Sequence, residues 1–352
     1  MTNNEINKAF SLPLLNWFTE HGRKNLPWQH PNEAYRVWIS EIMLQQTQVL
    51  TVIPYFERFI TVFPDIKTLS EASEDAVLAQ WSGLGYYSRA RNIHKTAKII
   101  WEKYRGKFPD ELTTLISLPG IGPSTAAAIA SLAFNQPTPI LDGNVVRVLA
   151  RYFMVDGSPE LSVVKKKLWE LAALCMTTHH CAEYTQAIMD LGATCCTLKN
   201  PHCQQCPLQN TCLAYRNAKV ENYPFKKIKK IRPIKEQQFL LLHTQENQIY
   251  LEKRPPIGLW GGLWCLPVID LNENPVEYID KYYGLNCITL NKLLTFKHSF
   301  SHFHLQITAL AMHIEPPVAT VAENNGQWFN AVELKNVGLA KPVNQIISHF
   351  LS

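Results

Sequence analysis

Four cysteines near the middle of the chain constrain its fold more than any other feature. They follow the spacing Cys196-x6-Cys203-x2-Cys206-x5-Cys212, in a polar loop that also holds prolines. Cysteines of a packed core have no reason to gather in such a loop, whereas four thiolates there can converge on one metal centre. Thiolate ligation suits tetrahedral zinc or an iron–sulfur cluster, and the spacing, unlike the paired C-x2-C of zinc ribbons, favours a 4Fe–4S cluster. The neighbouring Cys195 could replace Cys196 as a ligand.

Length and cysteine usage indicate a cytoplasmic protein with two cores. A chain of 352 residues can bury two sizeable cores. Its nine cysteines are an odd number and show no disulfide framework, which favours a reducing compartment. The N-terminus lacks a signal-peptide pattern, and no apolar run approaches the ~20 residues of a membrane span. We therefore expect no membrane association.

Positive charge is concentrated in the first two thirds of the chain. The net charge is +5, yet residues 233–352 carry 8 Lys and Arg against 10 Asp and Glu, and residues 1–232 carry 26 against 19. A basic first part indicates contact with a polyanion, although a modest excess of this kind is also common on solvated surfaces.

Hydrophobic periodicity changes along the chain. The first part is rich in helical spacing, interrupted by short Pro/Gly breaks, and the predicted helices are 36–50, 75–81, 89–104, 124–134, 144–153 and 162–175. After the basic stretch 216–235, the pattern predicts strand, turn and strand over 237–254, and further strands at 286–289, 304–313 and 327–329. The second part is therefore predicted to be α+β.

A second motif, Leu118-Pro-Gly-Ile-Gly-Pro-Ser-Thr-Ala126, joins two predicted helices through a glycine hairpin. Gly120 and Gly122 allow a sharp turn and leave amide groups uncovered at a helix N-terminus, where they can bind a DNA phosphate. An ordinary tight helix–helix turn is the alternative.

Glu41 is the first candidate for acid chemistry. Three of its four same-face neighbours at helical spacing are apolar, namely Val37, Trp38 and Leu44. Partial desolvation would raise the pKa of this carboxyl and keep it protonated, as a general acid requires. A glutamate that reaches solvent or pairs with Arg36 is the alternative.

Asp142 is the second candidate. It precedes an apolar-periodic helix, so it could simply be an N-cap. It could also be an ionised partner of Glu41, since two carboxyls with opposed pKa values suit cleavage of a glycosidic bond. The polar run 45–48, which follows Glu41, offers amides for reading base edges.

Together these motifs resemble a known family. The order WISEIMLQQTQV, GLGYYSRARN, LPGIGPSTA, LDGNVVRV and the cysteine loop is similar to the helix-hairpin-helix DNA glycosylases of the endonuclease III superfamily, and most similar to the MutY-type adenine DNA glycosylases. The resemblance is dense over residues 5–215 and looser beyond. It implies a monomeric, 4Fe–4S-containing enzyme of base excision repair, associated with the nucleoid, that removes adenine opposite 8-oxoguanine or guanine in double-stranded DNA.

The resemblance also implies roles for individual residues. Glu41 would protonate the flipped adenine, Asp142 would stabilise or capture the sugar cation, and Asn144 would orient them, with Gln186 in the adenine pocket. Contacts to DNA or the lesion are implied for Gln46, Thr47, Gln48, Leu84, Tyr86, Gly120, Gly122, Ser124, Phe300, Ser301 and His302. The glycines beside Leu84 and Tyr86 favour an exposed loop over core packing. Ser124 stands where glycosylase/lyases carry a Schiff-base lysine, so strong lyase activity is not expected.

The second part resembles a Nudix domain without its catalytic helix. Residues 254–267 match the opening of such a domain, but 268–284 lack the carboxylate arrangement that holds magnesium. The expected architecture is a mostly α, two-lobed helix-hairpin-helix glycosylase domain at 1–215 with a cluster loop at 196–212, a basic linker at 216–235, and an α+β Nudix-like lesion-recognition domain at 236–352. The alternatives are a pyrimidine glycosylase/lyase, a nucleotide pyrophosphatase and a non-enzymatic DNA-binding cluster protein.

Overall fold

The computed structural model describes residues 3–225, 231–315 and 326–352. The basic run 226–230 of the expected linker lies outside them. By its internal contacts the chain divides into two units, one formed by 1–70 and 95–229 and the other by 71–94 and 230–352. No helix in the part of the chain that the structure describes is both long and apolar enough to cross a lipid bilayer.

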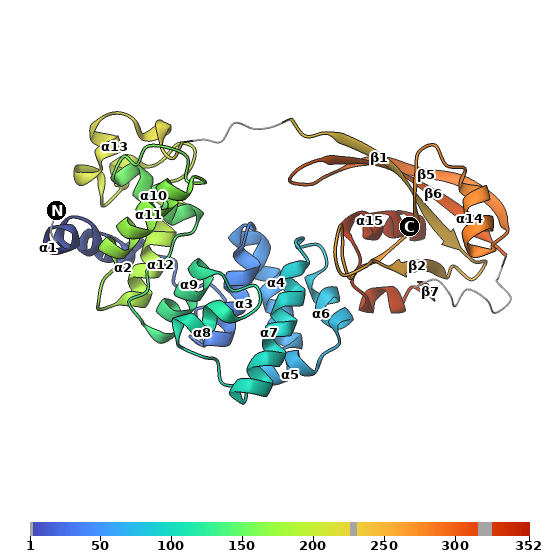
Figure 1. The fold of residues 1–352 in the computed structure, drawn as a ribbon, viewed down its shortest axis with the longest axis horizontal. Helices are drawn as coiled ribbons and strands as arrows, with labels where there is room; N and C mark the ends of the chain where they lie inside the picture. The colour runs from blue at the N-terminus through green and yellow to red at the C-terminus, as the bar shows by residue number, and fades with distance from the viewer. Residues whose placement is uncertain (1–2, 226–230, 316–325) are drawn as a thin grey trace. The chain divides into compact units, whose positions relative to one another are not determined.

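The first unit is helical, which confirms the predicted class (Figure 1). Its elements, some shared at the unit boundary, are α1 (Asn3–Ile6), α2 (Leu12–His21), α3 (Ala34–Leu44), α4 (Val49–Val62), α5 (Ile66–Glu71), α7 (Ser88–Tyr104), α8 (Leu112–Ser117), α9 (Pro123–Phe134), α10 (Gly143–Tyr152), α11 (Ser162–Cys175), α12 (Cys181–Asp190) and α13 (Leu213–Arg216). One core joins α1, α2, α9, α10, α11 and α12 through buried side chains such as Leu14, Leu149 and Ile188.

The predicted helix 36–50 is wrong at its C-terminal end. Helix α3 stops at Leu44, and α4 begins only at Val49. Gln46 lies between them with φ of 58°, a left-handed conformation that no α-helix continues through. The polar run 45–48 is therefore a loop between two helices.

The second unit contains α6 (Glu74–Trp81) and a seven-stranded sheet. The strands are β1 (Ile234–His243), β2 (Ile249–Lys253), β3 (Trp264–Cys265), β4 (Val268–Asp270), β5 (Cys287–Ser299), β6 (His304–Ile314) and β7 (Gly326–Phe329), with α14 (Pro275–Tyr283) and α15 (Lys341–Leu351). The order is β3-β2-β1-β6-β5, with β4 on β1 and β7 on β2. Only β1 and β6 pair in parallel among these described strands.

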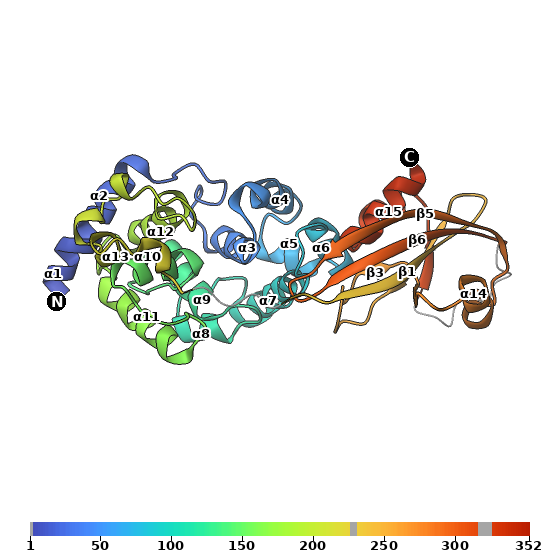
Figure 2. The same ribbon diagram turned by 90° about the horizontal axis from the view of Figure 1, so that it is seen from above.

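Strands β1 and β6 lie side by side in the sheet (Figure 2), and successive residues along each point to opposite faces. Leu240, Leu242 and Met312 pack with Ile279 of α14, whereas His243 of the opposite face contacts Phe350 of α15. The predicted strands at 237–254, 304–313 and 327–329 are confirmed, and the strand predicted at 286–289 is longer and continues to Ser299. The loop that joins β5 to β6 thus carries Phe300, Ser301 and His302.

Candidate active site and cysteine cavity

One cavity of about 640 Å³ in the first unit gathers the three expected catalytic residues and four of the other expected site residues. Glu41 enters it from α3 and Asp142 from the start of α10, 101 positions later in the chain. The other expected residues that line it are Asn144, Gln186, Thr47, Gln48 and Ser124. Gln46, Gly120 and Gly122 are not among its lining residues.

The Glu41 carboxyl is an acid of unusual weakness. Burial, followed by the negative charge of Asp142, raises its pKa to about 8. The helical neighbours explain the burial, because Val37 and Trp38 are almost fully enclosed. The expectation of a raised pKa for Glu41 is confirmed, and a carboxyl that stays protonated at neutral pH can donate its proton.

Asp142 is both the N-cap of α10 and a lining residue of the cavity. Its Oδ1 accepts a hydrogen bond from Val145 N at 2.7 Å. The sequence predicted opposed pKa values for Glu41 and Asp142. That prediction is wrong for Asp142, because burial raises its pKa as well. Hydrogen bonds from Val145 and Asn144 and the charge of Arg147 act in the opposite direction on this pKa.

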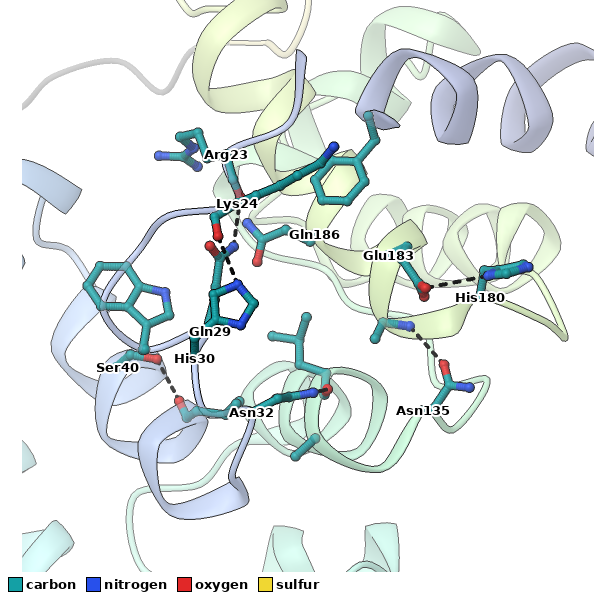
Figure 3. Close-up of a pocket in the computed structure, with 16 residues that line it drawn as sticks. Arg23, Lys24, Gln29, His30, Asn32, Ser40, Asn135, His180, Glu183 and Gln186 are labelled. Carbon is teal, nitrogen blue, oxygen red and sulfur yellow. Dashed lines mark hydrogen bonds and ion pairs between the residues drawn. The ribbon is translucent and has the colours of Figure 1, made fainter. Parts of the chain in front are cut away.

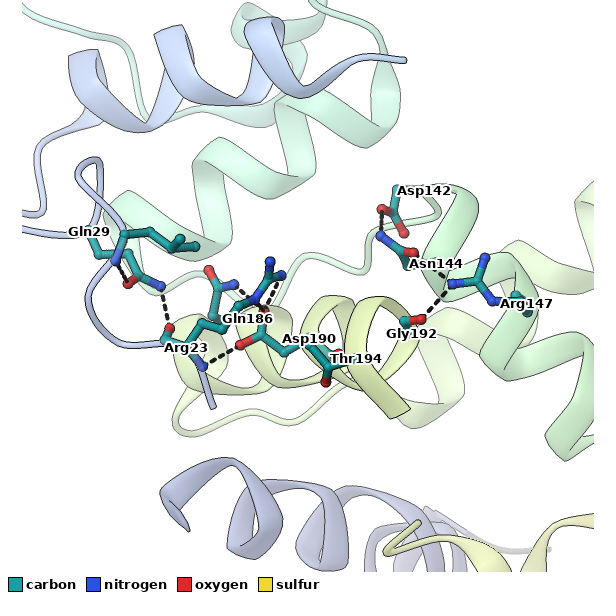
Figure 4. Close-up of polar contacts among 10 residues, drawn as sticks. Arg23, Gln29, Asp142, Asn144, Arg147, Gln186, Asp190, Gly192 and Thr194 are labelled. Carbon is teal, nitrogen blue, oxygen red and sulfur yellow. Dashed lines mark hydrogen bonds and ion pairs between the residues drawn. The ribbon is translucent and has the colours of Figure 1, made fainter. Parts of the chain in front are cut away.

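A hydrogen-bonded path connects Asp142 to the cysteine loop, and Figure 4 shows it as far as Arg147 and Gly192. Asn144 Nδ2 donates to Asp142 Oδ2 at 3.1 Å, and Arg147 Nη2 donates to Asn144 Oδ1 at 2.8 Å. Arg147 also donates through Nε to the Cys196 carbonyl at 2.7 Å and through Nη2 to the Gly192 carbonyl at 2.6 Å. The sequence analysis assigned no role to Arg147, although it lies one helical turn after Asn144 in the predicted helix.

The cysteine loop surrounds a small cavity of its own. Its lining includes the four predicted thiols and the spare one, Cys196, Cys203, Cys206, Cys212 and Cys195. Among residues 3–225, 231–315 and 326–352, no three or more His, Cys, Asp or Glu side chains are arranged to bind a single metal ion. The donors nevertheless fit a thiolate-held cluster, because apolar side chains such as Val148, Leu191 and Leu208 complete the wall.

Arg151 holds this loop together. Its side chain is buried, and it donates to Cys196 Sγ at 3.3 Å, to the Thr197 carbonyl at 2.7 Å and to the Tyr223 carbonyl at 2.9 Å. A guanidinium beside the sulfur stabilises negative charge on it, as a ligating thiolate requires.

The glycine hairpin forms the expected tight turn. Gly120 has φ of 78°, and Gly122 caps α9, whose first residue is Pro123. Both glycines are exposed, so the amides at this turn are open to a ligand. Ser124 Oγ accepts a hydrogen bond from Leu141 N at 3.2 Å, which joins the hairpin to the Asp142 segment.

The first turn of α4 presents an apolar side chain that the sequence analysis missed. Leu50, in the first turn of α4, is 82% exposed and lines the Glu41 cavity beside Gln48. An apolar side chain this exposed is unusual at the mouth of a site, and it can insert between bases. The signal available in the sequence was its position two residues after the polar run 45–48.

The second unit has a cavity of about 390 Å³. Tyr86 lines it, together with Phe300, Ser301 and His302 of the β5–β6 loop. Tyr86 is 49% exposed, as expected, but the expectation of an exposed Leu84 is wrong, since that side chain is only 7% exposed. The segment folds back on α6, where Trp81 Nε1 donates to the Gly85 carbonyl at 3.1 Å, and this enclosure buries Leu84.

A further cavity of about 570 Å³ adjoins the acid cavity in the first unit (Figure 3). The two cavities share Arg23, Trp28 and Gln186 as lining residues. Gln29 shapes the loop that carries Trp28, because it accepts from Leu26 N at 2.9 Å and donates to the Arg23 carbonyl at 2.8 Å. These three shared side chains form the boundary between the cavities.

Comparison with known proteins agrees with this geometry. Residues 39–173 match the family model described as HhH-GPD superfamily base excision DNA repair protein, and residues 238–349 match the NUDIX domain. A solved thermostable thymine-DNA glycosylase superposes with a TM-score of 0.55 and 28% identity, covering 61% of this chain and 98% of its own. Fold and site thus define a DNA N-glycosylase of the helix-hairpin-helix class with a Nudix-like second domain.

Curated relatives narrow the class further. The adenine DNA glycosylase of Buchnera aphidicola subsp. Acyrthosiphon pisum is 42% identical over 342 residues, which is 97% of either chain. The adenine DNA glycosylase of Homo sapiens is 32% identical, covering 96% of this chain and 73% of its own. The chain belongs to the adenine DNA glycosylase family.

Proposed function

We propose that this protein hydrolyses the N-glycosidic bond of adenine mispaired with 8-oxoguanine or guanine in double-stranded DNA. The observation that carries the proposal is the pairing of two partly buried carboxyls, Glu41 and Asp142, in one cavity that Gln186 also lines. This arrangement suits acid-assisted departure of a base from a sugar.

The chemistry follows from the state of each group. Protonated Glu41 donates to N7 of the flipped adenine, so the base leaves neutral, and the resulting carboxylate can accept a proton from the attacking water. Asp142 stabilises the positive charge that develops on the sugar, or captures it covalently, and Asn144 holds Asp142 in place through the 3.1 Å hydrogen bond. Base flipping is required because Glu41 cannot reach a stacked base.

The exposed turns of the first unit are proposed to bind the DNA. Gly120 and Gly122 would bind phosphate through backbone amides, with Ser124 beside them. Gln46, Thr47 and Gln48 would contact the duplex next to the flipped base, and Leu50 adds an apolar side chain able to insert there.

The cavity of the second unit is proposed to read the base opposite the adenine. Phe300 and Tyr86 offer aromatic surfaces on which a base can stack, and Ser301 and His302 offer hydrogen-bonding groups. These are the features needed to distinguish 8-oxoguanine from guanine. The domains proposed from the sequence are 1–215 and 236–352, joined by 216–235. Lesion reading would draw on both, because Tyr86 of the first domain lines this cavity.

We also propose a 4Fe–4S cluster held by Cys196, Cys203, Cys206 and Cys212. When bound, the cluster supplies a rigid, thiolate-ligated centre that orders the loop 196–212. Brown protein with broad visible absorption and about four irons per chain is the expected result, and colourless protein with one zinc per chain would contradict it. The enzyme is proposed to act as a monomer in the cytoplasm, at the nucleoid.

The direct test uses four duplexes that place adenine opposite 8-oxoguanine, guanine, thymine or cytosine. After incubation, alkali cleaves the strand wherever a base has been removed. Strand cleavage confined to the first two duplexes is the expected outcome. Cleavage at pyrimidines, or none with any duplex, would refute the proposed substrate.

Ser124 leads to a prediction about lyase chemistry. A serine cannot form the imine that a lysine forms with the opened sugar, so borohydride is expected to trap little protein on a substrate duplex. Ser124→Lys is the matched variant, expected to increase trapping while base excision continues. Efficient trapping by the unaltered protein, abolished by replacing one lysine, would contradict this prediction.

A further inference from the structure

Asp190, the last residue of α12, is a buried carboxylate for which the proposed chemistry has no role. Its side chain is fully enclosed, and four donors converge on it (Figure 4). Arg23 contributes its backbone N at 2.7 Å, Nε at 3.0 Å and Nη2 at 2.7 Å. Gln186 Nε2 donates to Asp190 Oδ1 at 2.8 Å. Burying a carboxylate is costly unless its charge is paired and its oxygens are hydrogen-bonded, and here both conditions are met.

The carboxylate fixes the orientation of the Gln186 amide. A carboxylate paired with a guanidinium only accepts hydrogen bonds, so Gln186 must present its NH₂ group to Asp190. The carbonyl oxygen Oε1 then lies at the other end of the amide plane. Among the residues that the structure describes, none donates to this Oε1. Gln186 is one helical turn before Asp190 on α12, so helical geometry maintains the pair.

Asp190 is itself prevented from turning. Arg23 binds its side chain through both the guanidinium and the backbone N–H. Thr194 Oγ1 donates only to the Asp190 backbone carbonyl, at 2.8 Å, and does not hold the carboxylate. The loop that Arg23 begins also carries Trp28, another wall of the acid cavity. The Gln186 amide, which lies at the boundary of the acid cavity, therefore cannot exchange its acceptor and its donor.

We propose that Asp190 is a positioning residue that sets base specificity, by holding Gln186 Oε1 as a fixed acceptor for the flipped base. The inference rests on the proposed excision of adenine. Adenine offers an exocyclic amino group at C6, which can donate to Oε1, whereas hypoxanthine and guanine offer an oxygen there. Two facing acceptors leave both groups unpaired in a buried site, which lowers the rate for 6-oxo purines about 10- to 100-fold.

The test compares single-turnover excision of adenine and hypoxanthine, each opposite 8-oxoguanine, in the full-length protein and its variants. Asp190→Asn places an amide that can donate beside Gln186, which frees the Gln186 amide to turn over. The ratio of the adenine rate to the hypoxanthine rate is expected to fall at least about tenfold. Thr194→Val, which removes only a hydrogen bond to the Asp190 backbone, is the control and should leave the ratio unchanged.

A second variant keeps the test decisive if Asp190→Asn does not fold. Gln186→Met preserves the volume of the side chain and the Arg23–Asp190 ion pair but removes the acceptor, so the ratio must fall there too. In the double variant the ratio should equal that of Gln186→Met alone, because Asp190 acts through Gln186.

Three outcomes would overturn the inference: an equal loss of rate on both bases in Asp190→Asn, an unchanged ratio in Gln186→Met, or additive effects in the double variant. A parent protein that removes no adenine would instead refute the proposed function. The two failures are therefore distinguishable in one set of measurements.

Discussion

Replacing Glu41 with glutamine is expected to lower the rate of adenine excision by about 10²- to 10⁴-fold and, at the same time, to stabilise the protein. The loss of rate follows because an amide cannot transfer a proton to the leaving base. The gain in stability follows because the pKa of the Glu41 carboxyl is raised to about 8 by burial and by the charge of Asp142. At neutral pH, folding must therefore add a proton to the Glu41 carboxyl, which is ionised in the unfolded chain.

The difference in stability between the parent and Glu41→Gln should depend on pH. Below the unfolded pKa, near 4.5, Glu41 is protonated in both states and its titration costs nothing. As the pH rises from there to about 8, the parent loses stability progressively, because the unfolded state gains the charged form that the folded state excludes. Glu41→Gln lacks this loss, so the difference in unfolding free energy should grow to about 4 kcal/mol by pH 8.

Two measurements check the prediction. Denaturant unfolding of parent and variant at pH 5 and pH 8 gives the stability difference, and single-turnover excision by the parent should decline as the pH passes through about 8. Glu57→Gln, on an exposed position of α4, is the matched control and should change neither quantity. A stability difference that is independent of pH would show that Glu41 is not the buried acid described above.

Short-range patterns in the sequence predicted the centres of both sites. Apolar neighbours at helical spacing predicted the raised pKa of Glu41, and the spacing of four cysteines predicted that their thiols share one cavity. Both inferences depend on residues close together in the chain, where geometry is nearly fixed by the local element.

Features that depend on distant residues were not predictable in this way. The Arg23–Asp190 pair joins positions 167 apart, and the upward pKa shift of Asp142 depends on burial that only the assembled cavity creates. The burial of Leu84 was missed for a local reason. Its flanking glycines indicate an exposed turn, but Trp81 Nε1, three residues before it, donates to the Gly85 carbonyl and holds the segment against α6. One local feature was also missed, because nothing in the run 45–48 signals the left-handed turn at Gln46.

Arg151→Met is expected to destabilise the first unit by roughly 3 to 5 kcal/mol and to release the proposed cluster. The Arg151 side chain is 2% exposed, and its donors reach the backbone carbonyls of two segments, 196–198 and 220–223. Methionine fills much of the same volume but donates nothing, so several enclosed carbonyls would lose their partners, and Cys196 Sγ would lose the adjacent positive charge.

The two expected losses can be measured separately. Iron content and visible absorption report the cluster, and thermal unfolding reports stability. Arg216→Met, at an exposed position near the end of α13, removes the same charge outside this network and should affect neither. Because Arg147 reaches the Cys196 carbonyl and, through Asn144, Asp142, release of the loop should also slow excision. Normal iron content with an unchanged unfolding midpoint in Arg151→Met would show that the cysteine loop holds its shape without this guanidinium.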